Sequence, residues 1–128
     1  MRIEHVGYMV LDPPRVARWY VEHLGFQVKR KMDESPFGHF LADSGGKVMI
    51  EIYNNPKAMV PDYASMDSLV LHLAFSVDDV EAERKRLLQA GAKAEGQIQT
   101  TPAGDQLAML RDPWGFAIQL CKRAEPMV

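Results

Sequence analysis

The pattern of apolar and polar positions begins with the signature of a β-strand. Residues 2–10 alternate in character and are rich in β-branched and aromatic side chains, as expected for a strand with one buried face. Asp12 can then cap a helix, and Pro14 suits its first turn because the missing N–H costs little there. Apolar residues recur at spacings of three and four after this point, which predicts a helix ending at Gly25; they are Val16, Trp19, Tyr20 and Leu24.

The remaining segments repeat this order. Three shorter strand candidates follow the first helix, at residues 26–32, 37–43 and 47–53. The second half has a strand candidate at 70–77 and a helix that Asp78 and Asp79 can cap and Gly91 can end. Three more strand candidates follow, at residues 93–99, 106–111 and 115–122. The sequence therefore predicts an α+β fold made of two β-α-β-β-β modules.

The two modules also correspond residue by residue. The segment Ile3 to Val10 returns as Val70 to Val77, which aligns His5 with His72. In the same way, residues 48–53 return as 116–121, which aligns Glu51 with Gln119. Because both offsets are close to half the chain, they indicate two copies of one unit related by a pseudo-twofold axis.

The segment between the copies has the composition of a linker. Asn54, Asn55, Pro56 and Pro61 interrupt any periodicity. We therefore expect a single domain over residues 1–128, with an internal repeat at 1–53 and 69–123 joined by a linker at 54–68.

Alternation places the candidate chemistry on one face of each module. His5, Glu51, His72 and Gln119 are each predicted to lie mid-strand, on the face opposite the apolar side chains that a helix can cover. A single histidine in a strand is more often a hydrogen-bonded structural residue than a ligand. Two histidines at equivalent positions of a repeat, with a carboxylate at a third, favour a metal site. Imidazole nitrogen and carboxylate oxygen suit zinc, nickel, cobalt, iron or manganese better than calcium or magnesium.

Composition narrows the choice of partner. Of 128 residues, 47% are hydrophobic and 25% charged, which is typical of a globular domain with a core of its own. The formal net charge is −2 and the basic residues are scattered, so we expect a small-molecule partner and no nucleic acid. A single cysteine, Cys121, excludes an internal disulfide. With no basic, apolar leader and no apolar run of about 20 residues, the chain is expected to be cytoplasmic and without a membrane partner.

Several short motifs resemble those of a known family. The sequence carries Ile3-Glu4-His5-Val6-Gly7, Trp19-Tyr20, Leu24-Gly25-Phe26, Val77-Asp78-Asp79-Val80 and Arg111-Asp112-Pro113-Trp114-Gly115. In this order they resemble the vicinal oxygen chelate superfamily, which includes glyoxalases, bleomycin resistance proteins and extradiol dioxygenases. The resemblance covers essentially the whole chain. It implies a curved mixed sheet around a central cavity, with a divalent metal bound by His5, Glu51, His72 and Gln119.

The resemblance also implies an activity. In metal-dependent members the ion acts as a Lewis acid on a substrate with two adjacent oxygens, as in the glyoxalase-type lyase and isomerase reaction through an enediolate. Glu51 is then the candidate catalytic base. The departure from the family pattern is Gln119, where glutamate is usual and where an amide cannot accept the substrate proton. Gln119 can be a ligand, a hydrogen-bond partner of a ligand, or neutral cavity lining.

Two other functions compete with this one. The resemblance also includes metal-free proteins that sequester an antibiotic of the bleomycin type, although these generally lack the metal-binding residues that this chain retains. Ring cleavage by an extradiol-type dioxygenase is less favoured, because Gln119 replaces an anionic ligand of iron. Members of the family commonly dimerise, so a homodimer is expected.

Overall fold

The computed structural model describes residues 1–127 and divides the chain into two compact units. The first unit, Met1–Pro61, contains β1 (Val6–Met9), α1 (Pro13–Leu24), β2 (Gln27–Lys31), β3 (His39–Ala42) and β4 (Met49–Tyr53). The second, which begins at Asp62, contains a 3-10 turn, η1 (Tyr63–Ser65), and then β5 (Leu73–Ser76), α2 (Val80–Gln89), β6 (Lys93–Thr100), β7 (Gln106–Arg111) and β8 (Ala117–Lys122).

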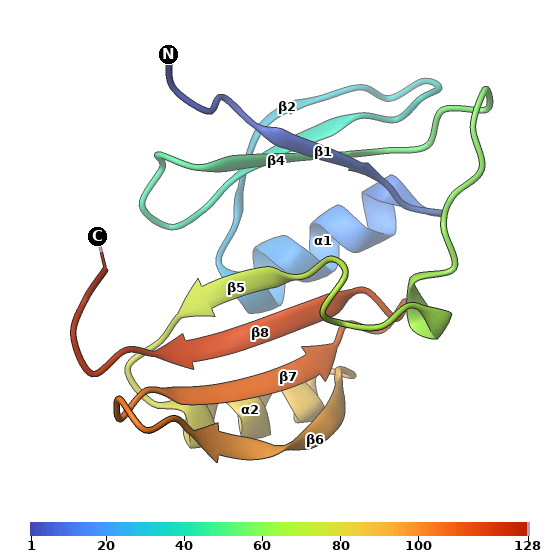
Figure 1. Ribbon diagram of the computed structural model, residues 1–128. Coiled ribbons are helices and arrows are strands. Elements are labelled where there is room, and N and C mark those ends of the chain that lie inside the picture. Colours follow the sequence, from blue (N-terminus) through green and yellow to red (C-terminus); the bar gives the residue numbers. More distant parts are fainter. Residues whose placement is uncertain (128) are drawn as a thin grey trace. The chain divides into compact units, whose positions relative to one another are not determined.

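Each unit contains one four-stranded mixed sheet. The strand orders are β1-β4-β3-β2 and β5-β8-β7-β6, with one parallel pair, β1 with β4 or β5 with β8, in each sheet (Figure 1). The other neighbours are antiparallel. This topology confirms the predicted α+β class and its two β-α-β-β-β modules. The assignment of residues 1–128 to one domain stays a prediction.

The first strand of each module is shorter than predicted. The sequence predicted strands at 2–10 and 70–77, whereas β1 and β5 have four residues each. β1 pairs with β4 in a ladder that begins at Val6, and β5 pairs with β8 in a ladder that begins at Leu73. Consequently His5 and His72, predicted to lie mid-strand, lie one residue before their strands. Their equivalence in the repeat is preserved.

Both helices begin as the sequence predicted. The carboxylate of Asp12 accepts a hydrogen bond from the backbone N–H of Arg15 at 3.2 Å, and Asp79 does the same for Ala82 at 2.9 Å. Gly25 follows α1 with φ of 75°, the left-handed conformation that glycine adopts without strain. Among residues 1–127, neither helix combines the length and the hydropathy of a membrane-spanning segment.

Each helix covers one face of its own sheet. On the covered face of the first sheet lie Leu41, Ile50 and Ile52, and on that of the second lie Leu110, Ile118 and Leu120; these six side chains are at most 3% exposed. Alternation turns Glu51 and Gln119 to the opposite face, where both are half-buried. The uncovered face of each sheet therefore carries the candidate chemistry.

The turn between β7 and β8 is built around a buried carboxylate. Asp112 is 2% exposed, and its Oδ1 accepts hydrogen bonds from the backbone N–H groups of Trp114 and Phe116, both at 2.9 Å. Gly115 completes the turn with φ of 89° and lies against the backbone of η1, so a Cβ built there would be 2.5 Å from Cβ of Ala64 and 2.8 Å from its Cα. The turn between β7 and β8 therefore packs directly against η1, with no space for a side chain at Gly115.

We predict that Gly115→Ala lowers the stability of the protein much more than Gly104→Ala. Both glycines have φ near 90°, so both variants have the same backbone strain, but a Cβ at Gly104 would meet only Cβ of Ala124 at 3.5 Å. The clash at Gly115 should add about 1–3 kcal/mol of destabilisation. Urea denaturation of the two variants measures the difference. Equal losses of stability would contradict the close packing of this turn on η1.

Candidate functional site

Glu51 lies on β4 in a space created by two glycines. Its cross-strand partners are Gly7 on β1 and Phe40 on β3. A Cβ on Gly7 would be 3.3 Å from Oε2 of Glu51, and a Cβ on Gly38 would be 3.5 Å from Oε1. Neither glycine adopts the left-handed conformation, so the backbone does not require glycine at these positions. The missing side chains instead leave space for the carboxylate of Glu51. The carboxylate therefore has room on both oxygens.

His5 is directed at this carboxylate. Its Nε2 lies 3.4 Å from Oε2 of Glu51, and its Nδ1 is hydrogen-bonded to the carboxylate of Glu4. The imidazole also packs on Phe40 in an edge-to-face arrangement, with ring centroids 5.3 Å apart and an interplanar angle of 87°. The hydrogen bond to Glu4, helped by the charge of Glu51, raises the pKa of His5. A carboxylate on Nδ1 orients the ring and makes Nε2 more basic, as is common for histidines that bind metals.

A cavity of about 410 Å³ lies beside His5. Its lining combines acidic, basic and apolar side chains: Glu4, His5, Lys29, Arg30, Phe40 and Met49. The two cations can attract anionic oxygens, whereas the ring and the thioether offer an apolar wall. The first unit therefore has a cavity suited to a small polar molecule.

Gln119 occupies the position of Glu51 in the second unit. It lies on β8 opposite Ala74 and Met109, where the first unit has Gly7 and Phe40. The thiol of Cys121 donates a hydrogen bond to Oε1 of Gln119 at 3.2 Å. Burial raises the pKa of Cys121, which keeps the thiol protonated and able to donate. The amide oxygen is thus turned along its own strand.

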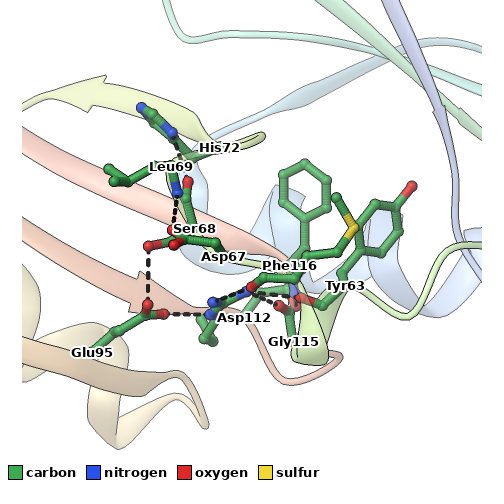
Figure 2. Close-up of polar contacts among 11 residues, drawn as sticks. Tyr63, Asp67, Ser68, Leu69, His72, Glu95, Asp112, Gly115 and Phe116 are labelled. Atoms are coloured by element: carbon green, nitrogen blue, oxygen red, sulfur yellow. Dashed lines mark hydrogen bonds and ion pairs between the residues drawn. The ribbon is translucent and has the colours of Figure 1, made fainter.

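His72 is held by a backbone carbonyl. Its Nδ1 lies 3.0 Å from the carbonyl oxygen of Ser68, which can only accept a hydrogen bond, so Nδ1 carries the proton (Figure 2). In the neutral ring Nε2 then has the lone pair that a metal or a proton donor requires. Both candidate histidines therefore have Nδ1 engaged, and Nε2 of His5 faces Oε2 of Glu51.

The structure brings one pair of the predicted ligands together. His5 contacts Glu51 in the first unit, whereas in the second unit His72 contacts Ser68 and Gln119 contacts Cys121. Within residues 1–127, no three or more His, Cys, Asp or Glu side chains form a group that could hold a metal ion. The set of four ligands stays a prediction. Sequence reasoning did not identify the role of Gly7 and Gly38, which leave space for the carboxylate of Glu51.

The geometry of the first pair fits a metal ion. Two ligands held tetrahedrally at about 2.1 Å from a cation such as zinc are about 3.4 Å apart. Nε2 of His5 and Oε2 of Glu51 are separated by 3.4 Å. The donor types, one imidazole and one carboxylate, also suit a borderline divalent ion.

Comparison with known proteins reveals a family match and several relatives. The model of the Glyoxalase/Bleomycin resistance protein/Dioxygenase superfamily matches residues 2–120. The chain is 28% identical over 127 residues to YwbC of Bacillus subtilis, an uncharacterised protein, covering 95% of this chain and 98% of that one. It is 26% identical over 131 residues to a probable lactoylglutathione lyase of Vibrio parahaemolyticus, covering 97% and 92%.

Among solved structures, the chain resembles TnmS3, an antibiotic-binding protein from Streptomyces. The sequence identity is 27%, the TM-score is 0.71, and the match covers 97% of this chain and 99% of TnmS3. Relatives of the chain thus include both a probable enzyme and a binding protein.

Proposed function

We propose that this chain, which belongs to the Glyoxalase/Bleomycin resistance protein/Dioxygenase superfamily, is a metal-dependent lyase or isomerase that acts on a small substrate with vicinal oxygens. The observation that carries the proposal is the His5–Glu51 pair, with its 3.4 Å separation and the two glycines that leave room around the carboxylate. Similarity to the probable lactoylglutathione lyase supports the same class of reaction.

In this proposal His5, Glu51 and His72 bind a divalent transition metal, and the amide oxygen of Gln119 is the fourth protein donor. The ion would supply Lewis acidity to two adjacent substrate oxygens. Glu51 would also take a proton from the substrate carbon, since it is the one carboxylate of the set. Lys29 and Arg30, which line the same cavity as His5, would attract an anionic group of the substrate.

A second candidate function is sequestration of an antibiotic without a metal. It is favoured by the similarity to TnmS3 over nearly the whole length of both chains. Phe40 and Met49 would supply the apolar wall of the binding cavity. An extradiol-type dioxygenase is less well supported, because Gln119 offers iron no negative charge.

We also propose a cytoplasmic homodimer. β1 and β5 lie at the edge of their sheets, and an edge strand exposes unpaired backbone groups. Leu69 and Val70, just before β5, are 78% and 69% exposed. Apolar side chains of this size beside an edge strand favour contact with a second copy.

We predict that purified protein binds one divalent transition metal per chain and that His5→Ala, Glu51→Gln and His72→Ala each weaken this binding by at least tenfold. Isothermal titration with zinc, nickel, cobalt and manganese measures the affinities. His23→Ala, which changes a histidine on α1, is the matched control and should bind like wild type. If wild type binds none of these ions but binds bleomycin in the presence of a chelator, sequestration is the function.

We predict that Gln119→Glu tightens metal binding, because it replaces a neutral oxygen beside a cation with a charged one. If Gln119 were cavity lining in a metal-free protein, the same change would place an uncompensated carboxylate in a half-buried position and lower stability. Thermal unfolding of wild type and variant, with metal and with chelator, separates the two cases. A variant that is less stable in both conditions would show that Gln119 does not belong to a metal site.

We predict that light scattering at low micromolar concentration gives twice the chain mass of 14.4 kDa. Leu69→Asp combined with Val70→Asp should shift this mass toward that of the monomer, because both charges would be buried in the interface. A wild-type mass of 14.4 kDa at this concentration would refute the dimer.

A further inference from the structure

A continuous line of polar contacts joins His72 to Arg111 in the second unit. His72 contacts the carbonyl oxygen of Ser68 at 3.0 Å, and the hydroxyl of Ser68 donates to Oε1 of Glu95 at 2.9 Å. The other oxygen of Glu95 is paired with Nε of Arg111. Figure 2 shows the contacts of His72, Ser68 and Glu95 as one connected path.

Arg111 anchors the segment that leads to His72. Its Nη1 donates to the carbonyl oxygens of Tyr63 at 2.8 Å and Gly115 at 3.2 Å, and its Nη2 donates to that of Met66 at 2.8 Å. The guanidinium therefore holds the residues at both ends of η1. Its side chain is only 15% exposed, so these charge-assisted bonds are shielded from water.

Glu95 connects this anchor to Ser68. The residue lies on β6 and Arg111 on β7, two strands of the same sheet. The hydrogen bond from Arg111 lowers the pKa of Glu95, so the carboxylate stays charged and accepts from Ser68 at neutral pH. Ser68 is 7% exposed, so burial separates its hydroxyl from water and favours the hydrogen bond to Glu95.

The chain between Ser68 and His72 is short and locally fixed. The carboxylate of Asp67 accepts from the backbone N–H of Leu69 at 2.8 Å, and its carbonyl oxygen accepts from Val70 at 3.0 Å. This turn directs the carbonyl of Ser68 at Nδ1 of His72. A displacement of Ser68 would therefore change the hydrogen bond to the imidazole.

We propose that Arg111 and Glu95 are positioning residues for His72: through Ser68 they keep the proton on Nδ1 and leave Nε2 as the nitrogen that binds the metal. The metal-binding part of this role rests on the proposed function, whereas control of the tautomer does not. A purely structural network would stabilise the segment 63–68 but would leave the choice of tautomer to the solvent.

The tautomer can be measured in metal-free protein. Long-range ¹H–¹⁵N correlation spectra at a pH where the imidazole is neutral distinguish Nδ1–H from Nε2–H in His72. We expect Nδ1–H to predominate in wild type and the Nε2–H population to rise at least threefold in Ser68→Ala and in Glu95→Gln. Arg111→Lys, which keeps the charge but loses the planar fork, should have the same effect.

Arg123→Lys is the matched control. Arg123 donates to Asp105 at 2.8 Å in the same unit, and this ion pair is not part of the path that joins Arg111 to His72. This variant should keep the wild-type tautomer. Wild-type protein with Nε2–H in His72, or Glu95→Gln with the same spectrum as Arg123→Lys, would overturn the proposal.

Metal titration tests the consequence for the site. Glu95→Gln should lower the affinity by about 10–100-fold, the usual effect of removing a partner of a metal-binding histidine, and should have no further effect in a His72→Ala background. Equal losses in both backgrounds would overturn the positioning role. Absence of metal binding in wild type would overturn the proposed function alone, because the tautomer result is obtained without metal.

Discussion

The organisation of this protein depends on one constraint, which is that each four-stranded sheet has a single helix to cover it. Alternation along the strands places Ile50, Ile52, Ile118 and Leu120 under the helices, where they are at most 3% exposed. The residues between them must face the other way, whatever their chemistry. Glu51 and Gln119 are therefore displayed by the same packing that buries their neighbours, so the hydrophobic core and the candidate site residues lie on opposite faces of each sheet.

This constraint explains which features the sequence could predict. The order of elements, the repeat and the faces of β4 and β8 follow from local periodicity and were predicted correctly. The placement of His5 and His72 within strands was wrong, because the end of an edge strand depends on its partner: the ladders start at Val6 and Leu73. Nothing local to residues 2–10 or 70–77 contains that information.

Long-range contacts account for what sequence reasoning missed. Gly7 and Gly38 matter only because the side chain of Glu51 lies against both, through strand pairings that bring distant segments together. Arg111 is part of a motif that the sequence did reveal, but its hydrogen bonds reach Tyr63 and Met66, residues 48 and 45 positions earlier in the chain. A motif of five residues can predict a turn; it cannot predict which distant carbonyls its arginine will bind.

The two units use the same framework with different chemistry. In the first, a carboxylate with room on both oxygens faces a histidine whose other nitrogen is paired with Glu4. In the second, an amide accepts from Cys121, and the histidine is held by a backbone carbonyl. The hydrogen bond to Glu4 and the charge of Glu51 raise the pKa of His5. Of the two equivalent strand positions, only that of the first unit carries a carboxylate, Glu51, whereas that of the second carries the neutral amide of Gln119. This difference agrees with the proposal that Glu51 is the single base, because the equivalent position of the second unit has no carboxylate.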